Sequence, residues 1–354
     1  MIRTVSILLL AALAVAGQEY KIAVVGLGHA HVGNHLSRMV KNEHARLVGV
    51  ADSVAALRES ARKRGVPETL IFSDYARLLD EAKPDIVWTF SETYRHLEIV
   101  KACAARKIHV MMEKPLSATY AQALEIRRLA RKHGIHVMTN YGSTWRPAIY
   151  TAKALVESGA VGPVFRIRKV TGHGGPGDPK TSYFASWLAD PEKNGGGALV
   201  DFGCYNVLHS LWLKGRPESV YATAHHLQPE RYPKVDDHAT IVLNYQDGTA
   251  IFEQSWSLPA RAPEDLEIFG RKGSLYVASD TLKKWTGKTS EDVKVDPLPP
   301  ERADPVAYVV NLLRKGTAPD GMSGLDINVD VMELLEAAKQ SIKSGRAVRL
   351  PLSK

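Results

Sequence analysis

The sequence has few of the features that mark whole classes of proteins. Its 354 residues include only two cysteines, Cys103 and Cys204, too few for a disulfide framework and without the spacing of a metal site. Histidines and acidic residues form no HExxH-type motif, so we predict no metal centre. The chain also has no internal repeat, low-complexity stretch or long block of like charge. Its net charge of +8 is spread along the sequence, so we expect no nucleic-acid partner.

The first residues differ in kind from the rest. The segment 1–18, MIRTVSILLLAALAVAGQ, has one arginine, an apolar run and then an Ala-x-Ala cleavage site. This layout is typical of a secretory signal peptide, and the apolar run is too short for a comfortable membrane span. We predict cleavage after Ala16, so that residues 1–16 are removed. The mature protein would then be periplasmic or extracellular, with no membrane attachment.

Short apolar runs alternate with helical patterns through the first half of the chain. The apolar runs include YKIAVV, ARLVGVA, DIVWTF, IHVMME and IHVMTN, and the helical patterns cover 53–64, 74–82, 95–106 and 117–132. Ser117 and Gly134 are the candidate caps of the last helix. Alternation of this kind predicts an α/β fold with a doubly wound parallel sheet and helices on both of its faces.

A glycine turn directly after the first apolar run is a candidate cofactor site. Gly26-x-Gly28 lies where glycines let a dinucleotide pyrophosphate approach the backbone and the next helix. The third glycine of the usual fingerprint is replaced by His31. Asp52 closes the second apolar run, where a carboxylate either accepts hydrogen bonds from the adenosine ribose or caps the following helix. Because this charge would repel a 2′-phosphate, the pattern favours NAD, with NADP as the alternative.

Two motifs carry a family resemblance. Glu113-Lys114-Pro115 begins at the last residue of the fourth quoted run, and the glycine run 195–197 lies just before Asp201. Together they resemble the glucose–fructose oxidoreductase/inositol dehydrogenase (Gfo/Idh/MocA) family. The resemblance covers roughly residues 20–354. It implies a Rossmann domain over 19–140, an α/β domain for substrate and oligomerisation over 141–325, and a C-terminal helix and tail over 326–354.

The sheet of the second domain is expected to be open and mostly antiparallel. Apolar and polar residues alternate around Asp247-Gly248, which is a strong hairpin signal, and a second hairpin has Gly273 in its turn. An open sheet face is suited to substrate shielding or to dimerisation. We therefore expect a homo-oligomer formed through the C-terminal sheet.

The resemblance also assigns roles to individual residues. The residues expected around the NAD(P) cofactor are Gly26, Gly28, His29, His31, Asp52, Ser91, His96, Glu113 and Lys114. Lys114 corresponds to a lysine near the nicotinamide and the reacting hydroxyl, and its neighbour Pro115 often follows a cis bond. The sequence departs from the family at Ser91-Glu92-Thr93, which replaces a Thr-Pro-Asn turn, and at the two histidines of the glycine loop.

Asp201, Tyr205 and His209 follow one another at intervals of four residues. On a helix these positions share one face, which is either a catalytic stripe or the polar outer face of an ordinary helix. With Lys114 on the cofactor side, we predict that the stripe faces the nicotinamide. Tyr205 would be the acid/base, Lys114 would lower its pKa, and Asp201 would orient either one. His209, one turn further, either contacts the substrate or supports the helix.

The remaining candidates concern the substrate. Trp145, Arg146, Tyr183 and Trp187 offer stacking faces and donors suited to a pyranose ring, or else pack in the core. We predict NAD(P)-dependent hydride transfer at a secondary hydroxyl or keto group of a sugar or polyol. An NAD-dependent glycoside hydrolase with a trapped cofactor is the first alternative, and a non-catalytic binding protein is the second. Export favours both alternatives, because free NAD is scarce outside the cytoplasm.

Overall fold

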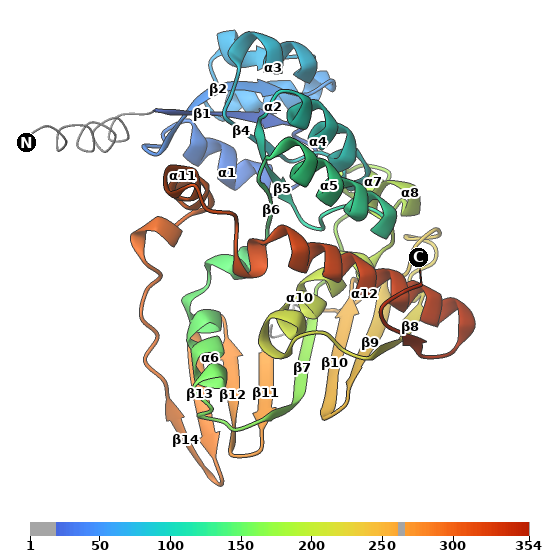
Figure 1. The fold of residues 1–354 in the computed structure, drawn as a ribbon. Helices are drawn as coiled ribbons and strands as arrows, with labels where there is room; N and C mark the ends of the chain where they lie inside the picture. Colours follow the sequence, from blue (N-terminus) through green and yellow to red (C-terminus); the bar gives the residue numbers. More distant parts are fainter. Residues whose placement is uncertain (1–18, 261–265, 354) are drawn as a thin grey trace, which may run out of the picture.

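A computed structural model describes residues 19–260 and 266–353. The predicted signal peptide lies outside these ranges. Figure 1 shows two layered units, with the N-terminal half at the top, a second sheet below it, and the long helix α12 between them. Within the described ranges, no helix is both long enough and apolar enough to cross a membrane.

The first unit is a six-stranded parallel sheet with the order β3-β2-β1-β4-β5-β6. Its strands are β1 (Tyr20–Val25), β2 (Ala45–Ala51), β3 (Ile71–Phe72), β4 (Ile86–Thr89), β5 (His109–Glu113) and β6 (Val137–Asn140). The helices between them are α1 (Val32–Met39), α2 (Ala55–Lys63), α3 (Tyr75–Ala82), α4 (His96–Ala105) and α5 (Tyr120–His133). The predicted doubly wound fold is confirmed. The strand order reverses between β1 and β4, where the carboxyl ends of such a sheet open a crevice.

Local sequence explains most of these elements. Strands β1 and β4 are covered on both faces by helices, which is why they read as continuous apolar runs. Gly134 ends α5 in the left-handed conformation, as predicted. The N-cap of α5 is Thr119 and not Ser117, because the Thr119 hydroxyl accepts the hydrogen bond from the Gln122 amide. The Ser117 hydroxyl instead donates to the Thr119 carbonyl.

The second unit is a nine-stranded sheet with the order β14-β13-β12-β11-β7-β10-β9-β8-β15. Its strands are β7 (Val164–Gly172), β8 (Ser219–His225), β9 (His238–Tyr245), β10 (Gly248–Ser255), β11 (Leu266–Gly270), β12 (Gly273–Ala278), β13 (Thr281–Thr286), β14 (Thr289–Asp292) and β15 (Val348–Arg349). Only β7 and β10 pair in parallel among these strands. The open, mostly antiparallel sheet and both predicted hairpins, β9–β10 and β11–β12, are therefore confirmed.

Helices cover one face of this second sheet. They are α6 (Pro147–Glu157), α10 (Gly203–Lys214) and α12 (Leu325–Ser344), and the short helix α9 (Ala198–Asp201) contacts β9 and β10. The short helices α7 (Tyr183–Leu188) and α8 (Pro191–Asn194) lie on the side of the first unit. Short 3₁₀ turns lie at Glu68–Leu70, Thr93–Arg95, Gly142–Trp145, Pro300–Arg302 and Gly321–Ser323. Along β9 the inward positions are buried and the outward positions are half-exposed, so the far face of the sheet is open.

One helix departs from the predicted domain boundaries. Helix α11 (Pro305–Lys315) was expected in the second domain, within 141–325. Its apolar residues instead pack with the core of the first unit, where Val306 and Val309 join a cluster that includes Ile22 and Trp88. The chain thus returns to the Rossmann domain before α12 begins at Leu325. Figure 1 shows α11 beside α1, far from the second sheet.

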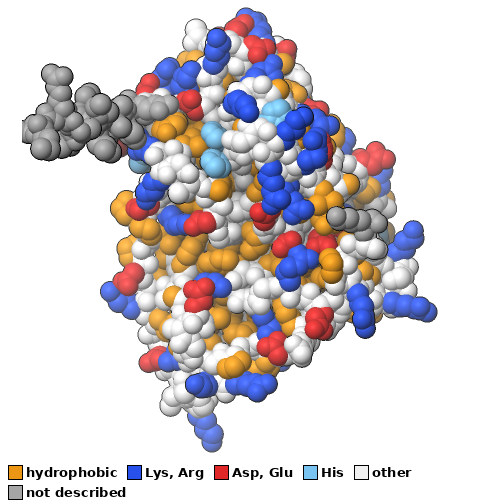
Figure 2. All heavy atoms as spheres, viewed as in Figure 1, with side chains coloured by type: hydrophobic (Ala, Val, Ile, Leu, Met, Phe, Trp, Pro, Cys, Tyr) orange, Lys and Arg blue, Asp and Glu red, His pale blue; other side chains and the backbone are white. Residues whose placement is uncertain are grey.

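The surface agrees with the scattered charge of the sequence. On the face shown in Figure 2, basic and acidic side chains are mixed over both units, with no continuous basic patch. This distribution is typical of a solvated surface.

Candidate active site

A cavity of about 470 Å³ lies between the two units. Its walls come from the loop after β1, the segment after β5, the 3₁₀ turn at Gly142–Trp145, strand β7 and the helices that follow the glycine run. The lining residues are His29, Ala30, His31, Lys114, Gly142, Ser143, Arg146, Lys169, Thr171, His173, Pro176, Phe184, Asp201, Phe202 and Tyr205. The structure therefore brings together Lys114, Asp201 and Tyr205, as predicted from separate motifs.

The glycine loop is closely covered on both sides. Gly26 has a φ of +79°, and a Cβ there would lie 2.6 Å from the Cα of Ser91. A Cβ on Gly28 would lie 2.8 Å from the Tyr183 ring. The Trp187 indole N–H donates to the Gly28 carbonyl at 3.3 Å. Trp187 thus contacts the glycine loop and is not among the cavity residues, which differs from its predicted role in binding the substrate.

The Asp52 side chain stabilises the conformation of the glycine loop. Its carboxylate accepts hydrogen bonds from the Leu27 amide (2.7 Å) and from the Val54 amide (2.8 Å). It therefore fixes both the glycine loop and the start of α2, as the alternative interpretation proposed. Burial raises the pKa of Asp52, and the two backbone hydrogen bonds oppose this shift. Its place at the end of β2 still suits recognition of an adenosine ribose.

The loop fits a dinucleotide. Helix α1 begins after His31 without a side-chain cap. The Val32 amide donates to the His29 carbonyl at 3.1 Å, and the amides that follow it at this helix end could donate to a phosphate. The buried His29 Nε2 has no partner among the described residues. His96 lies elsewhere: it is buried at the start of α4, and its Nδ1 contacts the Leu116 carbonyl at 3.2 Å. It does not line the cavity, and its role in binding the cofactor stays a prediction.

Lys114 and Asp201 form a buried ion pair in the wall of the cavity. The Lys114 ammonium donates to the Asp201 carboxylate and, at 3.2 Å, to the Asp201 carbonyl. The Trp256 indole N–H donates to the other carboxylate oxygen at 2.9 Å. Burial by itself lowers the pKa of Lys114, but the charge and hydrogen bond of Asp201, together with Tyr205 and Cys204, raise that pKa above the ordinary value. For Asp201, burial raises the pKa, and Lys114 and Trp256 bring it below the ordinary value. The bond between Lys114 and Pro115 is cis, as expected.

Tyr205 lines the cavity, but its ionisation differs from our expectation. Burial raises the pKa of its phenol above the ordinary value, and the opposing effect of Lys114 is smaller. The Lys114 Nζ lies 5.2 Å from the centre of the Tyr205 ring, over its face, while Asp201 compensates its charge. Lys114 does lower the pKa of Tyr205, as predicted, but burial raises that pKa by more, so the net shift is upward.

The three residues of the stripe do not share one continuous helix. Asp201 ends α9, and α10 begins at Gly203 after Phe202. Asp201 and Tyr205 still face the cavity. His209 is fully buried inside the second unit, and neither ring nitrogen has a partner among the described residues. Burial lowers its pKa well below the ordinary value. His209 is absent from the cavity wall, so its supporting role is the one that the structure favours.

The glycine run has a packing reason. A Cβ on Gly197 would lie 1.8 Å from the Asp236 carbonyl oxygen. The Asp236 carboxylate accepts hydrogen bonds from the amides of Gly197 (3.1 Å) and Leu199 (2.6 Å). The close approach of these two segments fixes the start of α9 and so places Asp201 opposite Lys114.

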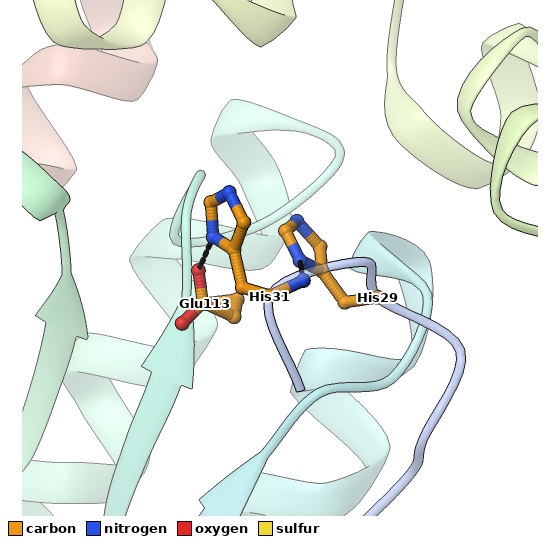
Figure 3. A group of neighbouring side chains, drawn as sticks. All are labelled: His29, His31 and Glu113. Atoms are coloured by element: carbon orange, nitrogen blue, oxygen red, sulfur yellow. Dashed lines mark hydrogen bonds and ion pairs between the residues drawn. The ribbon is translucent and has the colours of Figure 1, made fainter. Parts of the chain in front are cut away.

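Glu113 and the two loop histidines form a second polar group beside the ion pair. The carboxylate of Glu113 contacts His31 Nδ1 at 2.8 Å and accepts from the Asn140 amide at 2.8 Å. Burial would raise its pKa, but these hydrogen bonds and the nearby histidines lower it to about 2. Glu113 is thus an anion, held next to the glycine loop (Figure 3).

Trp145 and Arg146 separate in the structure. The Trp145 indole N–H donates to the Asn140 side chain at 2.8 Å, and the Trp145 ring packs against Tyr308. Because Asn140 in turn donates to Glu113, Trp145 helps to orient the Glu113 carboxylate. Trp145 is not a cavity residue, contrary to the prediction. Arg146 lines the cavity, as predicted.

Several site residues were missed from the sequence. Trp256 and Asn140 bind the two key carboxylates, and Lys169, Thr171 and His173 line the cavity. The last three alternate along β7 and the residue after it, and alternate positions of a strand face the same side. That spacing was the available signal. Nothing in the sequence alone connects Trp256 to Asp201.

This fold and site define a two-domain, dinucleotide-binding oxidoreductase. Residues 20–141 match the model of the oxidoreductase family with an NAD-binding Rossmann fold, and residues 149–276 match the GFO/IDH/MocA C-terminal domain. The chain belongs to the Gfo/Idh/MocA family and is an NAD(P)-dependent oxidoreductase.

The chain is similar in sequence to two named dehydrogenases and in fold to a solved oxidoreductase structure. The chain is 26% identical over 272 residues to a myo-inositol 2-dehydrogenase of Thermotoga maritima, covering 75% of this chain and 77% of that protein. It is 26% identical to a trans-1,2-dihydrobenzene-1,2-diol dehydrogenase of Xenopus tropicalis, covering 69% and 70%. Its fold is similar to that of an aldose-aldose oxidoreductase from Caulobacter crescentus, with a TM-score of 0.82, 24% identity and coverage of 94% and 100%.

Proposed function

We propose that this oxidoreductase acts on a secondary hydroxyl or keto group of a sugar or polyol bound in the cavity. The observation that carries the proposal is the buried pair of Lys114 and Asp201 at the junction of the glycine loop and the substrate unit. Bound NAD(H) supplies or accepts the hydride. The names of the relatives support the substrate class, since they include an inositol dehydrogenase and an aldose-aldose oxidoreductase.

The protein itself handles the proton and the oxygen. Lys114 is a buried ammonium that points its positive charge into the cavity, so it stabilises negative charge on the reacting oxygen. Tyr205 carries a proton at neutral pH, because the ordinary pKa of a phenol is about 10 and burial raises it further. We assign Tyr205 as the proton donor to the carbonyl oxygen of the substrate during reduction. During oxidation Tyr205 accepts the proton of the substrate hydroxyl. With both groups protonated at rest, reduction is favoured near neutral pH and oxidation speeds up as the pH rises.

Export and oligomerisation belong to the same proposal. A signal peptide over 1–16 would place the protein outside the cytoplasm, where a cofactor must be retained. The covering of Gly28 by Tyr183 and Trp187 supports tight retention. The same observation favours an NAD-dependent glycoside hydrolase as the second candidate, because that chemistry recycles a trapped cofactor. The open face of the second sheet, with exposed Tyr221 and Trp285, supports a homo-oligomer.

One experiment tests the cofactor and separates the two candidates. The purified protein is denatured, and the released nucleotide is identified by mass spectrometry. We expect NAD(H) at near one per chain. The native protein is then given keto-sugars with NADH, and separately p-nitrophenyl glycosides without added nucleotide. NADH oxidation supports the dehydrogenase, while nitrophenol release without NAD supports the hydrolase. No nucleotide and no turnover would overturn both and leave a binding protein.

Tyr205→Phe tests the proton donor. The substitution keeps the ring and deletes only the hydroxyl. Loss of general acid–base catalysis typically costs about 10²–10⁴-fold in rate. We expect a loss of that size in kcat, with cofactor binding and Tm close to those of the wild type. The matched control is Tyr221→Phe, which changes an exposed tyrosine of the second sheet. Normal turnover by Tyr205→Phe would refute the assignment.

A further inference from the structure

We propose that His29, His31 and Glu113 form a binding site for a divalent transition-metal ion, with Zn²⁺ as the probe. One donor atom from each of the three side chains lies within 4.8 Å of the other two. Figure 3 shows the two imidazoles, which come from the loop after β1, beside the carboxylate at the end of β5. These three residues lie on the cofactor side of the cavity, and the site does not include Lys114 or Asp201.

The donor set suits a transition metal. Two imidazole nitrogens and one carboxylate oxygen are ligands that Zn²⁺ takes at roughly 2.0–2.2 Å, which places neighbouring ligand atoms roughly 3.3 Å apart in a tetrahedral site. The contact between His31 Nδ1 and Glu113 Oε2, at 2.8 Å, is already close to that spacing. A metal ion would bind these two atoms in place of the proton between them, and the neutral His31 imidazole would then carry its proton on Nε2.

The buried imidazole is available for such an ion. His29 is 2% exposed, and its Nε2 has no hydrogen-bond partner among the described residues. Its Nδ1 accepts only a long hydrogen bond, 3.2 Å, from the His31 amide. The ring packs edge-on against Phe184, with a centroid distance of 5.1 Å. A buried histidine nitrogen that lacks a partner calls for an explanation, and a bound cation supplies one.

Hydrogen bonds from neighbouring side chains orient the Glu113 carboxylate. The Asn140 amide donates to Glu113 at 2.8 Å, and the Trp145 indole donates to Asn140 at 2.8 Å. Outer hydrogen bonds of this kind orient the ligands of known metal sites and strengthen metal binding. These two hydrogen bonds give Trp145 and Asn140 a role in orienting Glu113, in addition to their packing.

The proposed site is open to the cavity at His31, so a fourth ligand could bind the ion there. The His31 side chain is 45% exposed, and both histidines line the cavity of about 470 Å³. Three protein ligands with one open position are characteristic of catalytic zinc sites, whereas structural sites have four. The ion would thus add a positive charge to the cofactor side of the cavity, with an open position for an oxygen ligand.

The experiment measures metal binding directly. Tag-free protein is treated with EDTA, dialysed, and titrated with ZnCl₂ by calorimetry. We expect one ion per chain with a Kd at or below the micromolar range. Co²⁺ titration should give a visible absorption band from a site of nitrogen and oxygen ligands. These readouts need no substrate, and the recovery of NAD(H) is measured separately.

Three variants make the test specific. His31→Ala and Glu113→Gln should each weaken Zn²⁺ binding at least tenfold, and Asn140→Ala should weaken it by about 10–100-fold. The control is His109→Ala, which removes a histidine that stacks on His136 and is outside the cavity. It should bind like the wild type. Circular dichroism without metal checks folding, and since His31 is exposed, its variant keeps the test valid if Glu113→Gln unfolds. Wild-type protein that binds less than one ion per five chains, or His31→Ala with unchanged affinity, would overturn the proposal.

Discussion

The pairing of Lys114 with Asp201 leads to a quantitative prediction about stability. The Lys114 side chain is 6% exposed and the Asp201 side chain 7%, so neither charge is well solvated. Removing one partner leaves the other charge buried and uncompensated, which costs about 3–5 kcal/mol in the free energy of unfolding. Lys114→Met and Asp201→Asn should each destabilise the protein by that amount. Asparagine is chosen because it keeps an acceptor for the Trp256 indole N–H.

The double variant isolates the interaction itself. Lys114→Met/Asp201→Asn contains neither charge, so the penalty of an unpaired buried ion disappears. Its loss of stability should therefore be smaller than the sum of the two single losses by about 2–3 kcal/mol, near the upper end of measured coupling energies. The assay is urea unfolding at 25 °C, followed by circular dichroism, on all four proteins.

The pH dependence gives a second check on the same pair. The pKa of Asp201 is lowered, so its contribution is present above the unfolded value of roughly 3.9 and is lost as the pH falls through the folded pKa. The pKa of Lys114 is raised, so its contribution is present below roughly 10.4 and is lost as the pH rises through the folded pKa. The coupling energy should be the same at pH 6 and pH 8. A coupling within about 0.5 kcal/mol of zero at both values would refute the ion pair.

Other predictions follow from the cofactor loop and from proton transfer. Asp52→Ala should weaken NAD binding, relax discrimination against NADP and loosen the loop, because Leu27 loses its acceptor; equal affinities of wild type and variant for both nucleotides would reduce Asp52 to a structural residue. Gly28→Ala should slow nucleotide exchange or displace α7, since its Cβ would lie 2.8 Å from the Tyr183 ring; stopped-flow fluorescence measures this, and unchanged rates would contradict the close packing. The ratio of oxidation rate to reduction rate should rise with pH between 7 and 10, because Tyr205 must lose its proton to act as a base; a flat ratio would exclude Tyr205 from proton transfer.

The sequence by itself determined the two-domain α/β architecture. The alternation of β-rich runs and amphipathic helices is a local pattern, and the parallel sheet follows from it. The hairpins around Asp247-Gly248 and at Gly273 were equally local. Lys114 and Asp201 were found because each lies in a short motif of a recognisable kind, and the resemblance to the family connected them before their contact was visible.

Only the tertiary structure decided how the site behaves. His31 and Glu113 are 82 positions apart, so no spacing rule could show that they touch. The pKa of Tyr205 rises because burial outweighs the field of a lysine that Asp201 already compensates, and burial is a property of the assembled core. Helix α11 returns to the first domain because its apolar face completes that core. Periodicity predicts which face of a helix is apolar, but only packing decides which core that face joins.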